Sequence, residues 1–149
     1  MKLKEELYNQ CKLFVDSRLH TVQEIISSNQ KALQSETKSS AGDKHETGRA
    51  MLQLEMEKAS QQLVGVTKMN QILSKIDVTK NSENAHLGSI VFTSSGNYFL
   101  SISAGNISVE GKDYFAVSLS SPIGKLLLGK KISDECNFNN NKIKVILVR

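Results

Sequence analysis

The chain has 149 residues, a formal net charge of +4, 39% hydrophobic residues, 5% aromatic residues and no tryptophan. This length suits one ordinary domain or two small ones, and so weak a positive charge does not by itself name a class of partner. The two cysteines lie far apart and form no C-x-x-C pair, which excludes a zinc ribbon and a thioredoxin-like redox site on spacing alone.

The first predicted helix runs from about residue 2 to about residue 35. Its apolar residues recur at helical spacing on one stripe, whereas the opposite face is rich in Gln, Lys, Glu and Ser. The stripe consists of Leu3, Leu7, Cys11, Phe14, Val22, Ile25 and Leu33, and it is interrupted by Arg18 and Asn29. A long helix with one apolar stripe is not stable alone in water, so it requires a partner along its whole length.

A heptad seam predicts the partner helix, which ends near Ile76. Its members step by alternating intervals of four and three residues: Leu52, Met56, Ala59, Leu63, Val66, Asn70 and Leu73. A polar residue such as Asn70 within a seam fixes the register of the two helices at some cost in stability. The intervening turn, near residues 39–47, is too short to let the helices diverge, so we expect an antiparallel coiled coil over residues 1–77.

After a linker at residues 78–85, which has no periodicity, the pattern changes to short strands separated by turns. Strands are predicted at 90–92, 98–102, 107–109 and 114–119, and two more flank a turn at 139–141. A short helix follows Ser121, which suits the N-cap position, and Pro122, which suits the first helical position. The sequence therefore predicts an α+β protein in which residues 86–149 form a small antiparallel sheet with one short helix.

Two stretches resemble the Gre transcript-cleavage factors of bacterial RNA polymerase. The more specific one is Val117-Ser118-Leu119-Ser120-Ser121-Pro122-Ile123-Gly124-Lys125-Leu126-Leu127-Leu128-Gly129-Lys130-Lys131. It is similar to the strand, Ser-Pro, short helix and Gly-Lys sequence of the family's FKBP-like C-terminal domain. The other stretch, Gly42-Asp43-Lys44-His45-Glu46, is similar to the family's Gly-Asp-x-x-Glu at the tip of its coiled coil. With the order of coiled coil and sheet, the resemblance covers nearly the whole chain.

The resemblance implies a transcription elongation factor that is not itself an enzyme. In Gre factors the tip enters the secondary channel of RNA polymerase, where its acids help to hold the second catalytic Mg²⁺ and order the attacking water. The polymerase then cleaves backtracked RNA. Carried over to this chain, Asp43 and Glu46 would be these acids, and carboxylate oxygens are ligands that Mg²⁺ prefers. The Mg²⁺ would belong to the polymerase, so we expect no cofactor and no stably bound metal in the isolated protein.

The resemblance also implies which other residues meet the polymerase. Ser121, Pro122 and Ile123 correspond to a loop that contacts the rim of the secondary channel. Three basic residues surround the acid pair and are expected to lie near phosphates of the nascent RNA: Lys38, Lys44 and Arg49. With no signal peptide and no apolar run of membrane-spanning length, we expect a monomeric, cytoplasmic partner of RNA polymerase without membrane contact.

Alternatives remain at both levels. Asp43-x-x-Glu46 directly before a helix is also a capping box, in which the two side chains satisfy backbone amides of the first turn. At the level of function, the rival interpretation is a regulator without a catalytic role that plugs the secondary channel and inhibits or modulates transcription. A third interpretation is a structural interaction module that does not contact polymerase.

Overall fold

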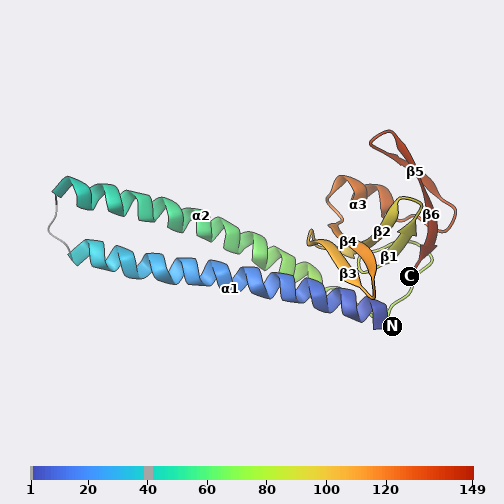
Figure 1. Cartoon of the computed structure of the whole chain (residues 1–149), viewed down its shortest axis with the longest axis horizontal. Coiled ribbons are helices and arrows are strands. Elements are labelled where there is room, and N and C mark those ends of the chain that lie inside the picture. Colours follow the sequence, from blue (N-terminus) through green and yellow to red (C-terminus); the bar gives the residue numbers. More distant parts are fainter. Residues whose placement is uncertain (1, 39–41) are drawn as a thin grey trace. The chain divides into compact units, whose positions relative to one another are not determined.

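The structure, a computed structural model, describes residues 2–38 and 42–149, and the side chains of residues 36–38 and 42–46 lie outside that description (Figure 1). Two long helices come first, followed by a six-stranded sheet with one short helix, which confirms the predicted α+β class. The elements are α1 (Lys2–Lys38), α2 (Gly42–Ser74), β1 (Ile90–Thr93), β2 (Gly96–Ser101), β3 (Gly105–Val109), β4 (Lys112–Ser118), α3 (Pro122–Leu127), β5 (Glu135–Phe138) and β6 (Asn141–Val148).

The chain divides into two compact units. Val15–Met69 forms one, here called the hairpin unit, because it consists of most of α1 and α2. Met1–Phe14 and Asn70–Arg149 form the other, here called the sheet unit, which therefore includes the first turns of α1 and the last turns of α2.

In the hairpin unit, α1 and α2 run side by side in opposite directions (Figure 1). The α2 residues that turn inward are the predicted heptad positions. Ala59 and Val66 are buried, and Leu52, Met56 and Leu63 are half-buried. The intervening residues are almost all exposed, so alternating steps of four and three residues hold one narrow face of α2 against its partner.

On α1 the seam differs from the predicted stripe. Val15 is buried and Ile26 is half-buried, whereas Ile25, which the stripe included, is 38% exposed. The inward-facing position after Val22 is Ile26, four residues later, and not Ile25, three residues later. Asn29, which the stripe counted as an interruption, is a buried member of the seam.

The six strands form one sheet in the order β3-β4-β2-β1-β6-β5. Four of its five strand pairs are antiparallel, as predicted, but β2 and β4 are parallel, with Tyr98 opposite Phe115 and Ser101 opposite Ser118. The expectation of a purely antiparallel sheet was therefore wrong at this pair. The chain reverses direction after β2 to form the edge strand β3 and reverses again at the β3–β4 turn, so β4 returns beside β2 in the same direction.

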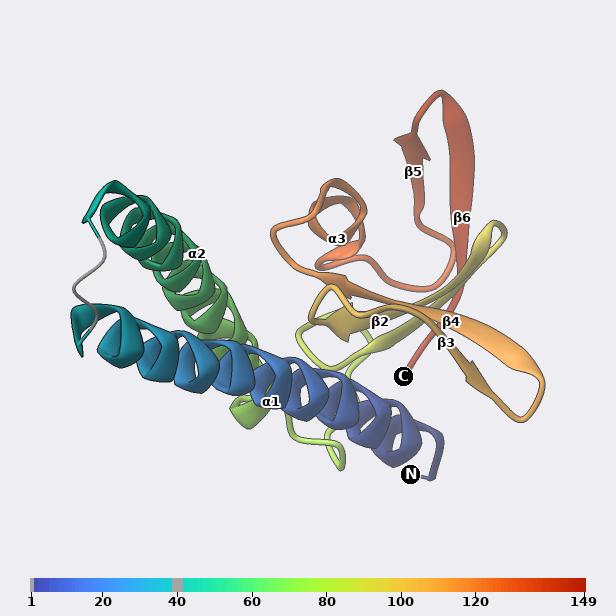
Figure 2. The same cartoon turned by 60° about the vertical axis from the view of Figure 1, so that its left-hand side comes forward.

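The interior strand β2 is covered on both faces. On one side Leu100 belongs to an apolar cluster that includes Ile123 and Leu127 of α3. On the other side the hydroxyl of Ser101 lies 3.7 Å from the Sγ of Cys11 on α1, and both residues are buried. Figure 2 shows α3 and the first turns of α1 on opposite sides of the sheet. The start of α1 thus completes the core of the sheet unit.

The segment between α2 and β1 is held by the same helix. Lys4 is fully buried, and its Nζ donates a hydrogen bond to the backbone carbonyl of Lys80 at 2.7 Å. Burial lowers the pKa of the Lys4 ammonium, and the nearby carboxylate of Asp77 opposes this shift. At the far end of the segment Ala85 is buried, its amide donates to the carbonyl of Lys130, and its carbonyl accepts from the amide of Gly129. The segment predicted as a linker therefore makes specific contacts near both of its ends.

The packing of α1 on the sheet gives a direct stability test. Leu7 is fully buried, so Leu7→Ala should lower the free energy of unfolding of the whole chain by about 2–5 kcal/mol. The matched control is Leu13→Ala on the same helix, because Leu13 is 62% exposed and should change the free energy by less than about 0.5 kcal/mol. Urea denaturation followed by circular dichroism measures both. Equal, small losses would contradict the assignment of the first turns of α1 to the core.

Candidate functional site

The predicted acid pair lies where α2 begins. α1 ends at Lys38 and α2 starts at Gly42, so the backbone of Asp43 and Glu46 belongs to the start of α2. Their side chains, and those of Lys38 and Lys44, are outside the described part of the structure. The geometry of the two carboxylates therefore stays a prediction, as does the choice between a capping box and a metal-directed role.

Arg49 is the one member of the predicted basic group whose side chain is described. It is exposed on α2, three residues beyond Glu46 in the sequence. An exposed guanidinium at this position is available to a phosphate group, although ordinary solvation accounts for it equally well.

The other predicted contact site is the start of α3, and the structure explains its sequence in detail. Ser121 is the N-cap: its backbone is extended, and its Oγ accepts a hydrogen bond from the amide of Gly124 at 3.1 Å. The same hydroxyl donates to the carbonyl of Ser118 at 2.7 Å. Pro122 occupies the first helical position, where its missing N–H is not needed. These contacts fix the direction in which α3 leaves β4.

The three predicted contact residues are not equally available to a partner. Pro122 is exposed, Ser121 is half-buried and Ile123 is 7% exposed within the apolar cluster beneath α3. Pro122 can therefore touch another protein without any change of the fold, whereas the side chain of Ile123 is committed to the core.

Gly124 is required by close approach of two backbone segments. A Cβ atom at this position would overlap the backbone carbonyl oxygen of Ser118 and would lie 2.9 Å from the Oγ of Ser121. Real Cβ atoms essentially never approach within 3.0 Å of such a group. Only glycine allows α3 to pack this closely on the end of β4, which accounts physically for the Ser-Pro-Ile-Gly sequence.

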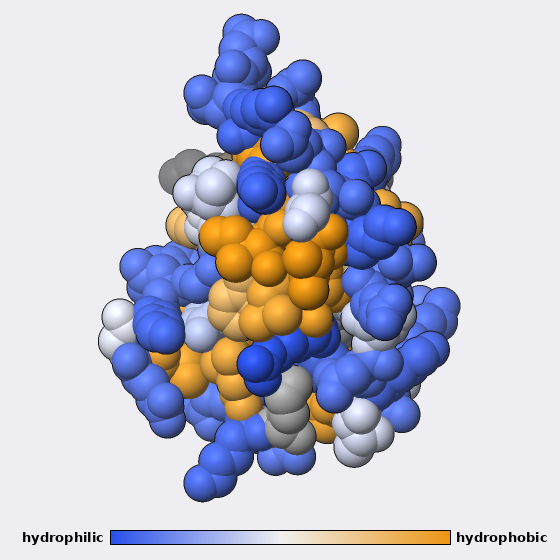
Figure 3. Space-filling view, turned by 90° about the vertical axis from the view of Figure 1, so that its right-hand side faces the viewer, coloured by the Kyte–Doolittle hydropathy of each residue, from blue (hydrophilic) through white to orange (hydrophobic). Residues whose placement is uncertain are grey.

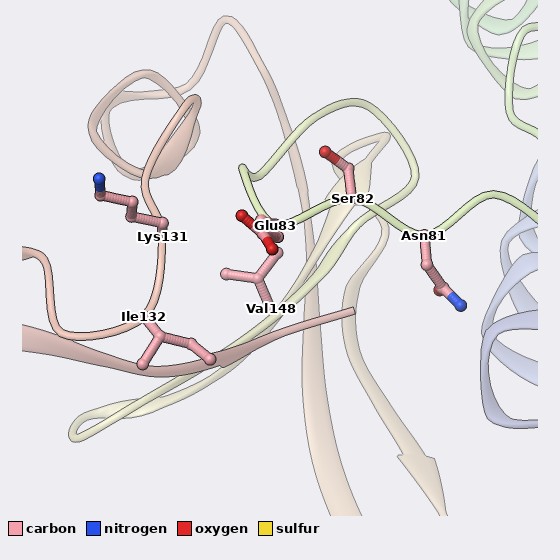
Figure 4. Close-up of a pocket in the computed structure, with 6 residues that line it drawn as sticks. All are labelled: Asn81, Ser82, Glu83, Lys131, Ile132 and Val148. Carbon is pink, nitrogen blue, oxygen red and sulfur yellow. The ribbon is translucent and has the colours of Figure 1, made fainter.

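A cavity of about 500 Å³ lies beside this region, and sequence reasoning did not identify it. Figure 4 shows its lining: three residues from the segment before β1, two from the segment after α3, and one from the end of β6. They are Asn81, Ser82, Glu83, Lys131, Ile132 and Val148. A lining of two apolar residues, two uncharged polar residues, one acid and one base suits a mixed polar and apolar group. No local sequence pattern marks the cavity, because its lining comes from three segments that are distant in sequence.

An apolar surface lies on the face of the molecule that Figure 3 draws. Figure 3 shows it as a continuous hydrophobic area framed by polar residues. Three large hydrophobic residues that follow α3 in the sequence are exposed, Leu128 at 45%, Ile132 at 54% and Ile146 at 58%. The register of β1 and β6 shifts between Phe92 and Thr93, so that Val145 and Leu147 pair with β1 while Ile146 between them has no partner residue there. This irregularity in β6 accompanies the exposure of Ile146.

Among the described residues, no cluster of three or more His, Cys, Asp or Glu side chains is arranged to hold a metal ion. In the same part of the chain, no helix combines the length and the apolar character that crossing a bilayer requires.

Comparison with protein-family models and with curated proteins found no match for this chain.

The close contact at Gly124 predicts that alanine lowers stability at this position, and Gly65 in α2 provides the control. Gly124→Ala should destabilise the protein by at least about 2–3 kcal/mol, because the new methyl group forces α3 away from β4. Gly65→Ala should instead stabilise it by about 0.5–1 kcal/mol, because Gly65 lies inside α2 with no atom within 4 Å of the added methyl. Thermal and urea unfolding measure both variants, and a Gly124→Ala protein as stable as the wild type would contradict the described contact.

Proposed function

We propose that this protein is a Gre-type transcription elongation factor. In this proposal it docks on RNA polymerase, inserts the turn between α1 and α2 into the secondary channel, and stimulates the polymerase's own cleavage of backtracked RNA. The observation that carries the proposal is a combination in one chain. An acid pair, Asp43 and Glu46, lies at the start of the second helix of a long two-helix hairpin, and the sheet that follows carries the Ser-Pro-Ile-Gly start of α3.

The dimensions of the helices support this use. A continuous helix of 33 residues, such as α2, extends over about 50 Å, since each residue adds 1.5 Å. Its partner α1 has 37 residues and shares one seam with it, so neither helix has to be stable alone. A rod of two helices is narrow enough to carry two carboxylates into a channel that a folded sheet cannot enter.

The side chains of this protein would contribute carboxylate ligands and positive charge to the polymerase active site. When the polymerase holds its catalytic Mg²⁺, the carboxylates of Asp43 and Glu46 would supply oxygen ligands to it and help to order the attacking water. The protein itself breaks no bond in this scheme. Lys38, Lys44 and Arg49 would offset the negative charge of the nearby RNA, and their contribution should weaken as salt is raised.

Neutralising the acids is the central test. Asp43→Asn and Glu46→Gln should each lower RNA cleavage in halted, backtracked complexes of the cognate polymerase by about 100-fold, because a charge that stabilises the reacting centre is lost. Both changes keep side-chain size and remove only a charge near the start of α2, so the fold should be preserved. The matched control is Glu55→Gln, which removes an exposed acid from the same helix and should leave cleavage unchanged.

Other results would select the alternatives. If wild-type protein fails to shorten the RNA at saturating Mg²⁺ but inhibits synthesis, and the neutral variants inhibit equally, the protein is a plug of the secondary channel. If the Glu46→Gln variant loses only stability and neither variant loses activity, the acids form a capping box. Absence of any binding to polymerase would leave the structural interaction module.

Docking should depend on the exposed residue at the start of α3. Pro122→Ala should weaken binding of the full-length protein to polymerase by about fivefold, the effect of losing roughly 1 kcal/mol at an interface. Lys112→Ala, an exposed change at the start of β4, is the control. Ile123→Ala is unsuitable, since its loss of core packing would mimic a loss of docking. Unchanged affinity for Pro122→Ala, with unfolding temperature preserved, would remove this residue from the docking site.

A further inference from the structure

Burial in the hairpin unit decreases toward the turn between its helices. On α1 the last buried apolar residue of the described part is Val22, and on α2 the first is Ala59. Residues 23–35 and 47–58, here called the turn-proximal segment, contain half-buried apolar side chains such as Ile26, Leu33 and Met56. Among the described residues of this segment, one side chain is buried, and it is polar.

That residue is Asn29, which is 7% exposed. Its Nδ2 is the one buried side-chain nitrogen or oxygen that makes no hydrogen bond among the residues that the structure describes. A buried donor without a partner loses its hydration and gains nothing in return. The turn-proximal segment therefore combines shallow apolar packing with a polar group whose burial opposes closure.

The second asparagine of the seam shows the contrast. Asn70 is half-buried, and its Oδ1 accepts a hydrogen bond from the Nζ of Lys12 at 2.9 Å. This polar position is satisfied by a charged donor, and such hydrogen bonds are among the stronger ones in proteins. Both asparagines thus lie in the apolar seam, but Asn29 opposes the packing of the two helices whereas Asn70 stabilises it.

We propose that Asn29 makes the turn-proximal segment a separate opening unit. This segment unzips and closes while residues 15–22, 59–69 and the sheet unit stay folded, because local opening takes place where few apolar side chains are buried. This property concerns the hairpin itself and holds whatever the turn contacts.

Native-state hydrogen exchange of the full chain, read by mass spectrometry, tests the proposal. In the wild type, amides of the turn-proximal segment should exchange at least about tenfold faster than those of residues 59–69. Asn29→Leu should slow exchange in the turn-proximal segment about tenfold or more, since it replaces the unpartnered amide with an apolar side chain. Exchange in the sheet unit should not change.

Three variants separate this effect from others. Asn70→Leu removes an acceptor that is in use, so it should not slow exchange anywhere. Ser28→Leu, at the exposed neighbouring position, measures the helix propensity of leucine and should have less effect than Asn29→Leu. Asn29→Ala removes the amide without adding volume, and it should also slow exchange relative to Ser28→Ala even if Asn29→Leu changes the association state.

Two outcomes overturn the proposal. Unchanged or faster exchange in both Asn29 variants would show that the amide does not oppose closure. Slower exchange spread equally over residues 15–22, 23–35, 47–58 and 59–69 would show that the hairpin opens as a single cooperative unit without a separate segment.

Discussion

The burial of β2 on both faces is the constraint on which the sheet unit depends. An interior strand with Phe99, Leu100 and Ser101 all buried needs an apolar cover on each side. On one side α3 supplies it, and on the other the first turns of α1 supply it through Cys11. The first residues of the chain are therefore part of a core whose strands begin at residue 90. The buried Lys4 donates a hydrogen bond to the carbonyl of Lys80 and so holds the segment between α2 and β1 against the start of α1.

The residues that carry the family resemblance are also residues that the fold needs. Ser121 caps α3, and Gly124 allows the backbone of α3 to approach β4. A similar sequence in another protein would thus be expected wherever the same strand-to-helix packing occurs. Pro122 is the exception, because it is exposed and its structural role is confined to starting the helix. A substitution of Pro122 would therefore test the proposed docking with little disturbance of the fold.

The success of the sequence-based predictions followed the strength of each local pattern. The seam of α2 was predictable because its apolar residues repeat at alternating intervals without ambiguity. On α1 the adjacent Ile25 and Ile26 are chemically equal, so only packing against the partner could decide which points inward. The parallel pairing of β2 and β4 was not predictable, because a period of two residues is the same for both pairing directions. The cavity at Ile132 and the burial of Lys4 arise from residues distant in sequence, which no local pattern connects.

The contact between Cys11 and Ser101 spans 90 residues of sequence, and this separation has a consequence for synthesis of the protein. A ribosome adds about 5–20 residues per second, so the apolar face at the start of α1 waits roughly 5–18 s before β2 exists to cover it. The helical hairpin can close during this interval, since both of its helices, α1 and α2, precede β1 in the sequence. Closure of the hairpin leaves Leu7 and Cys11 without the sheet that buries them, however, so this apolar face stays exposed to self-association until translation has delivered β2.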